Sequence, residues 1–131
     1  MGVDYGTKRV GVALSDEGGT MAFPCAILEN GKGLMGEIKN ICAREGVEQI
    51  VVGESLNYQG APNQVMEEIN NFVGEIGEAI GIPVAFQREF LSTQQARFFQ
   101  EKKKHVDDSA AAVILQSYLD TKNSKSIRET I

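Results

Sequence analysis

Residues 2–16 read GVDYGTKRVGVALSD, and this stretch decides the fold. Two apolar runs, residues 3–5 and 10–14, flank a short turn that contains Gly6, which is typical of two antiparallel strands joined as a hairpin. Asp4 is the one acidic residue in the first run. Because burying an unpaired carboxylate is costly, the pattern predicts that Asp4 either binds a divalent metal ion or accepts hydrogen bonds from the turn.

The segments that follow the hairpin predict one mixed sheet with helices on both faces. The further expected strands, which are short apolar or β-branched runs, are residues 20–28, 49–53 and 82–86. The expected helices, which show apolar residues at helical spacing or a capping pattern, run from residue 34 to a stop at Gly46, from about 63 to 80, from Ser92, and from Asp107 or Asp108 to Leu119. This order predicts an α/β fold with the first strand at the centre of the sheet.

The length and composition indicate the number of domains and the cellular location to expect. The chain has 131 residues, of which 42% are hydrophobic, and a net charge of -5, so we expect one domain over residues 1–120 and a flexible tail over 121–131. Cys25 and Cys42 lack the spacing of a zinc site and read as core residues. No apolar run approaches the roughly 20 residues that span a bilayer. We therefore expect a cytoplasmic protein without a membrane partner.

Three acidic residues lie at the expected ends of different elements. Asp4 is in the first strand, Glu89 follows the fifth strand, and Asp107 opens the last helix. Because strand ends of such sheets gather at one edge, these three carboxylates can converge, and together they suit Mg²⁺ or Mn²⁺. A pair of such ions activates water and stabilises a leaving oxygen, which predicts hydrolysis of phosphodiester bonds.

Each of these acids also has a simpler interpretation. Asp107 or its neighbour Asp108 could cap the last helix, since Asp is a favoured N-cap residue. Glu89 could be a solvated loop residue paired with Arg88. Glu54, directly after the fourth strand, is open between a fourth metal ligand and a surface acid.

Basic and polar residues near these acids are candidates for substrate binding. They are Lys8, Arg9, Asn57, Arg88, Lys102, Lys103 and Lys104. Cations on either side of the scissile bond would hold phosphates without reading bases. The lysine run is explained equally well as a solvated surface, and His105 beside it reads as an exposed loop residue.

Four segments together resemble the YqgF-type family of ribonuclease H-like proteins, which includes Holliday-junction resolvases and nucleases that mature pre-16S rRNA. The segments are residues 2–13, residues 50–60, Glu89 with residues 91–93, and residues 106–119. The resemblance implies a ribonuclease H-like fold over residues 1–120, with Asp4, Glu89 and Asp107 at the family's metal-binding positions. It implies a metal-dependent nuclease that acts on RNA or branched DNA during ribosome biogenesis or junction resolution.

The chain departs from this family pattern at two places. Arg88-Glu89-Phe90 stands where the family usually has Asp-Glu-Arg, and Glu54-Ser55 stands where it commonly has Leu-Pro. A supporting acid and a phosphate-binding arginine are thereby replaced.

Two other functions compete with the nuclease. One is a nucleic-acid-binding module without catalysis, which the replaced neighbours of Glu89 favour. The other is a nucleotide-binding protein of the actin-like fold, because Asp-x-Gly-Thr followed by Gly-Val-Ala resembles a phosphate loop of that class. Such proteins need a second lobe, for which 131 residues leave no room. The sequence leaves monomer and homodimer open, since symmetric junction cleavage needs two active sites and RNA trimming needs one.

Overall fold

The computed structural model describes residues 1–54, 64–88 and 109–130 of the chain. The strands are β1 (Gly2–Tyr5), β2 (Arg9–Ser15), β3 (Ala22–Glu29), β4 (Ile50–Glu54) and β5 (Val84–Arg88). The helices are α1 (Leu34–Glu45), α2 (Gln64–Ala79) and α4 (Ala110–Thr130). None of the described helices combines the length and the apolar character needed to cross a membrane.

The five strands form one mixed sheet with the order β3-β2-β1-β4-β5. β2 is antiparallel to both β1 and β3, whereas β4 is parallel to both β1 and β5. The predicted central position of the first strand is therefore confirmed. Because β1, β4 and β5 run in the same direction, their carboxyl ends meet at one edge of the sheet.

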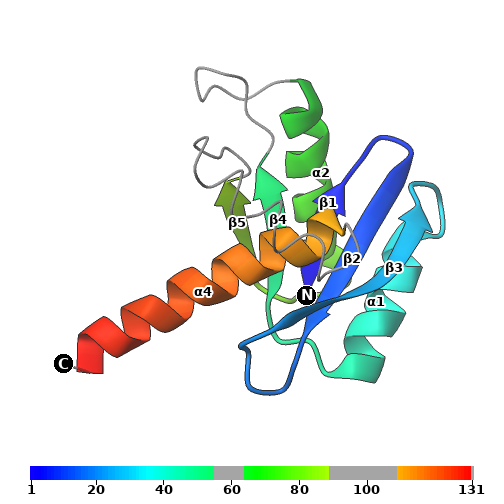
Figure 1. Cartoon of the computed structure of the whole chain (residues 1–131). Helices are drawn as coiled ribbons and strands as arrows, with labels where there is room; N and C mark the ends of the chain where they lie inside the picture. The colour runs from blue at the N-terminus through cyan, green and yellow to red at the C-terminus, as the bar shows by residue number, and fades with distance from the viewer. Residues whose placement is uncertain (55–63, 89–108, 131) are drawn as a thin grey trace.

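Helices α1 and α2 cover one face of this sheet, and α4 crosses the other (Figure 1). The apolar stripes predicted for α1 and α2 are confirmed by the buried residues of the core, which include Leu34, Ile38, Ile41 and Cys42 of α1 and Met66, Ile69, Phe72 and Ile76 of α2. Gly46 ends α1 with φ of 66°, a left-handed conformation that glycine adopts without strain.

Helix α4 packs unusually close to the central strand. A Cβ atom added at Gly2 would lie 2.6 Å from Leu115 Cβ and 2.7 Å from the carbonyl oxygen of Ala111. Buried Gln116 ties the helix to the start of β3, because its Oε1 accepts a hydrogen bond of 2.9 Å from the backbone N–H of Ala22. Only glycine at position 2 allows this approach, so β1 and α4 are held as one unit.

The structure changes several expected boundaries. Strand β5 covers 84–88 rather than 82–86, and β3 begins at residue 22 rather than 20. Helix α4 begins at Ala110 and continues to Thr130, so the expected helix end at Leu119 was wrong, whereas the flexibility expected of residues 121–131 stays a prediction. The apolar period ends at Leu119 because the later turns of α4 project beyond the sheet (Figure 1). The expected helix from Ser92 lies outside the described residues, and the division into domains stays a prediction.

Candidate active site

Asp4 faces α4 because of the two-residue period of β1. Its neighbour Val3 is fully buried in the core beneath α1 and α2, so Asp4 belongs to the opposite face. Gly11 of β2 lies directly across from Asp4. A Cβ atom at Gly11 would lie 3.7 Å from Asp4 Cβ and 3.6 Å from Ala111 Cβ. The half-buried carboxylate is therefore close to the first turn of α4.

A groove of about 500 Å³ opens at this point between the sheet and the start of α4. It is lined by Asp4, Arg9, Gly11, Val12, Pro24, Cys25, Ala26, Ile27, Ser109, Ala110 and Ala111. We call it the Asp4 groove. Arg9 is the basic residue and Asp4 the acidic residue among these lining residues. The amino end of α4 adds the partial positive charge of its backbone N–H groups, which favours carboxylates and phosphates nearby.

The turn after Asp4 is held by a residue that the sequence analysis did not select. Asn30 Nδ2 donates a hydrogen bond of 2.8 Å to the carbonyl oxygen of Gly6, and the backbone N–H of Asn30 donates one of 3.0 Å to the carbonyl oxygen of Lys8. Lys8 and Arg9 are exposed at this turn, and Arg9 lines the same groove as Asp4. The expected closeness of Arg9 to Asp4 is thus found. For the contact of Asn30 with this turn, the Asn-Gly pair at 30–31 signals only a local turn.

Ser109 caps the amino end of α4. The backbone N–H of Ala112 donates a hydrogen bond of 3.1 Å to Ser109 Oγ, and that of Val113 donates one of 3.1 Å to the Ser109 carbonyl oxygen. This is the N-cap pattern, and the first helical residue is Ala110. The simpler interpretation of Asp107 or Asp108 as the cap is therefore wrong, because Ser109 has that role.

Glu54 falls on the other face of the sheet. Val52 pairs with Val3 and is buried in the same core, so the two-residue period places Gly53 beside Asp4 and Glu54 on the α1 and α2 face. Of the two interpretations of Glu54, this orientation favours the one without a metal ion.

Several predicted site residues lie outside the described part of the chain. They are Asn57, Glu89, Phe90, Lys102, Lys103, Lys104, His105, Asp107 and Asp108, together with the side chain of Arg88. Within residues 1–54, 64–88 and 109–130, no group of three or more His, Cys, Asp or Glu could hold a metal ion. The metal site of Asp4, Glu89 and Asp107 stays a prediction.

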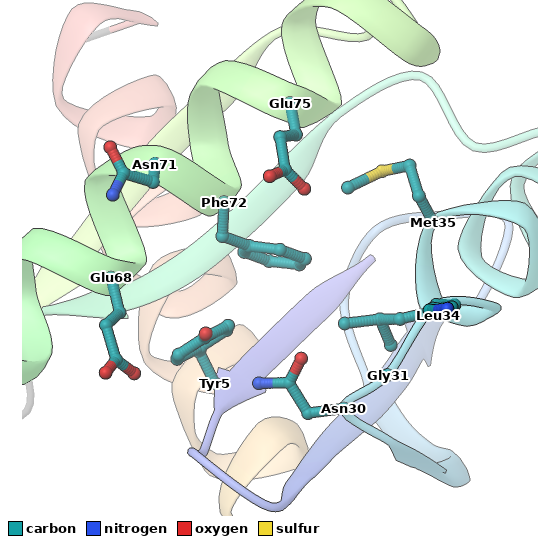
Figure 2. A pocket seen from close by; sticks show the side chains of 10 residues that line it. Tyr5, Asn30, Gly31, Leu34, Met35, Glu68, Asn71, Phe72 and Glu75 are labelled. Atoms are coloured by element: carbon teal, nitrogen blue, oxygen red, sulfur yellow. The ribbon is translucent and has the colours of Figure 1, made fainter.

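A second pocket, of about 400 Å³, lies on the opposite face between α1 and α2 (Figure 2). The ring centroids of Tyr5 and Phe72 are 5.0 Å apart at its base. Glu68 and Glu75 of α2 also line it. This pocket has these two acidic residues against one basic residue, Lys32, whereas the described lining of the Asp4 groove has one of each, so the Asp4 groove is the better candidate for a nucleic-acid substrate.

Asp16 is an acidic residue whose carboxylate is held by hydrogen bonds within its own turn. Its Oδ2 accepts a hydrogen bond of 2.7 Å from the Thr20 hydroxyl, and its Oδ1 accepts one of 2.8 Å from the Thr20 backbone N–H. These hydrogen bonds, the one from the Thr20 side chain above all, lower the pKa of Asp16 below its usual value. The carboxylate closes the turn between β2 and β3, at the end of β2 remote from the Asp4 groove.

Comparisons with known proteins identify the family and the fold of this chain. Residues 1–121 match the RuvX family, described as Holliday junction resolvase. A protein of Nitratidesulfovibrio vulgaris named "Putative pre-16S rRNA nuclease" is 34% identical and covers 95% of both chains. A protein of the same name from Caldanaerobacter subterraneus subsp. tengcongensis is 37% identical over 95% of this chain and 98% of its own.

A solved structure, that of Thermus thermophilus RuvC, has the same fold. It superposes with a TM-score of 0.57 over 94% of this chain and 95% of its own, at 13% identity. The predicted ribonuclease H-like fold is confirmed.

Proposed function

The chain belongs to the RuvX family of Holliday junction resolvases and is therefore a nuclease, and we propose that Asp4, Glu89 and Asp107 hold the divalent ions of its active site. The observation that carries this proposal is the position of Asp4 in a groove whose other wall is the capped start of α4. Carboxylates at such a point suit Mg²⁺ or Mn²⁺.

The length of the chain before Ser109 supports Asp107 as a second ligand. It precedes Ser109 by two residues, and Ser109 lines the Asp4 groove. Two residues of extended chain span at most about 7 Å. Since Ser109 is the helix cap, capping of α4 does not require the carboxylate of Asp107, which is consistent with a ligand role.

Strand pairing supports Glu89 as the third ligand. Gly53, beside Asp4, pairs with Gln87 of β5, and Glu89 follows Gln87 by two residues. Because side chains two residues apart in a strand share a face, one more residue of extended chain would carry Glu89 to the face of Asp4.

The residues of the groove are proposed to have different roles in metal binding and phosphate binding. When bound, two divalent ions supply an activated water on one side of the scissile phosphate and stabilise the leaving oxygen on the other. Asp4, fixed in the central strand, orients the ligand set, and Arg9 attracts the phosphate backbone at the rim. Lys8, Asn57, Arg88, Lys102, Lys103 and Lys104 are proposed to contact further phosphates.

The natural substrate is proposed to be structured nucleic acid in the cytoplasm. Precursor 16S rRNA comes first, because two relatives with nearly full coverage carry that name. Four-way junction DNA comes second, because it is the substrate in the family description. A monomer suffices for the RNA reaction, whereas a homodimer would be needed to cut a junction symmetrically.

The test is a cleavage panel of labelled single-stranded RNA, precursor 16S rRNA and four-way junction DNA, each with Mg²⁺, Mn²⁺ or EDTA. We expect cleavage of at least one substrate that EDTA abolishes. Binding without cleavage in every divalent condition would instead support the non-catalytic module. ATP binding without nucleic-acid cleavage would support the actin-like alternative.

A further inference from the structure

The Asp4 groove continues across the sheet as one row of paired residues. Asp4 of β1 pairs with Gly11 of β2, and Gly11 pairs with Ile27 of β3. Two interstrand spacings separate Asp4 from Ile27, about 10 Å. The strand β3 is at the edge of the described sheet, so the row leads from the proposed metal site to the open side of the molecule.

Ile27 gives the outer end of this row an apolar surface. Its side chain is 75% exposed, the largest exposed fraction among the large hydrophobic residues of the described chain that stand out to solvent. Pro24 and Ala26 lie beside it in the groove lining. Arg9 is the basic residue of the described lining, and the part formed by Ile27 and Pro24 carries no charge, so that part suits an apolar group better than a phosphate.

Gly11 keeps the passage between the two ends open. A side chain at this position would point into the groove between Asp4 and Ala111, at 3.7 and 3.6 Å from their Cβ atoms. These are ordinary contact distances, so glycine is not needed to avoid a clash. What glycine preserves is the empty space beside Asp4.

The apolar parts of a nucleic acid are the faces of its bases. In a duplex these faces are stacked on neighbouring pairs, and the grooves and backbone are what a protein meets. In an unpaired strand each base can leave the stack and contact a protein side chain. A groove that joins a metal-binding carboxylate to an exposed isoleucine therefore fits an unpaired nucleotide.

We propose that the Asp4 groove seats an unpaired nucleotide adjacent to the scissile phosphate, with its base against Ile27 and its backbone beside Arg9. This inference rests on the proposed nuclease function and deepens it. It makes a strand with an unpaired segment at the cleavage point the substrate class, and a continuous duplex a poor substrate.

Phe23 provides a matched control for Ile27. It lies on the same strand and is 53% exposed, but it pairs with Leu14, which packs on the core of the α1 and α2 face. Ile27→Glu and Phe23→Glu therefore make the same change of charge on the same strand, on opposite faces of the sheet.

The experiment measures binding of labelled oligonucleotides by fluorescence anisotropy in Ca²⁺. With single-stranded RNA we expect Ile27→Glu to raise Kd by about tenfold, as for the loss of one buried isoleucine contact, and Phe23→Glu to change it by less than about twofold. A series of oligonucleotides with one abasic site each should weaken wild-type binding at one position, and that effect should be absent in Ile27→Glu. Equal losses for the two variants, a flat abasic series, or equal binding of a blunt duplex would overturn the inference.

A replacement variant and a parallel cleavage assay separate the possible outcomes. If circular dichroism shows that Ile27→Glu is unfolded, Ile27→Thr replaces it, since Thr keeps the β-branched shape and exchanges the apolar ethyl arm for a hydroxyl. Equal cleavage rates for the wild type and the Ile27 variant would contradict the groove inference but leave the nuclease proposal intact. Weaker binding by the Ile27 variant, together with no cleavage by the wild type, would contradict the nuclease proposal but leave the binding groove intact.

Discussion

Asn30 Nδ2 lies 2.8 Å from the carbonyl oxygen of Gly6, so a residue at the end of the third strand holds the turn that follows Asp4. This hydrogen bond joins segments 24 residues apart. It sets the position of Lys8 and Arg9 relative to the carboxylate, which makes Asn30 a positioning residue.

We expect Asn30→Ala to lower the free energy of unfolding by about 1 kcal/mol, the usual value of one hydrogen bond. It should also raise KM for cleavage more than it lowers kcat, because Arg9 would lose its fixed position at the rim of the groove. Urea denaturation and steady-state kinetics measure the two effects. Asn40→Ala, at an exposed position of α1, is the control, and equal kinetics for the two variants would contradict the role of Asn30.

Removal of the cap of α4 should affect both stability and activity. Ser109→Ala deletes the oxygen that accepts the hydrogen bond from Ala112, at a cost of about 1 kcal/mol. We expect cleavage to fall as well, because the proposed ligand Asp107 precedes this cap by two residues. Ser109→Asn, which also caps helices, should restore both, and a variant that restores stability without activity would argue against this link.

Gly2→Ala tests the close packing of β1 on α4. The added Cβ would lie 2.6 Å from Leu115 Cβ, so the helix must shift, and we expect a loss of more than about 2 kcal/mol in urea denaturation. Gly36→Ala is the control, because nothing lies within 4 Å of an added Cβ there and it should stabilise α1 by up to about 1 kcal/mol. A stable Gly2→Ala protein would mean that α4 is not held at this distance.

Stability should depend on acid pH through Asp16. Its folded pKa is below the usual 3.8, so its contribution is fully present above pH 3.8 and is lost as the pH falls through the folded value. The difference in unfolding free energy between wild type and Asp16→Asn should therefore shrink in that window. Denaturation curves at a series of pH values measure it, and a difference that does not change with pH would contradict the assignment.

The central features of the fold follow from local sequence. The helical spacing of apolar residues in α1 and α2 indicates two helices, and the glycine after α1 indicates where that helix ends. The apolar run of β1 indicates a strand. The buried core is consistent with all three predictions. Asp4 could be selected as a site residue because a carboxylate within an apolar strand is costly to bury without a partner.

The features that sequence reasoning missed depend on tertiary contacts. Asp107, Asp108 and Ser109 are three consecutive residues that can each cap a helix, so local preference cannot choose among them. Packing of Ala111 and Leu115 against Gly2 is what sets where α4 lies on the sheet. The role of Asn30 likewise depends on Gly6, 24 residues earlier in the chain.

The most direct measurement compares cleavage by Asp4→Asn and Asp16→Asn in Mg²⁺ and Mn²⁺, on the substrate that the wild type cuts best. Both variants make the same chemical change, but only Asp4 lines the groove at the start of α4. We predict that Asp4→Asn loses at least about a hundredfold in kcat while it stays folded, as expected for a lost contribution to stabilising the transition state, and that Asp16→Asn keeps wild-type cleavage. Folded Asp4→Asn protein that cuts as fast as Asp16→Asn would contradict the assignment of Asp4 to the metal site.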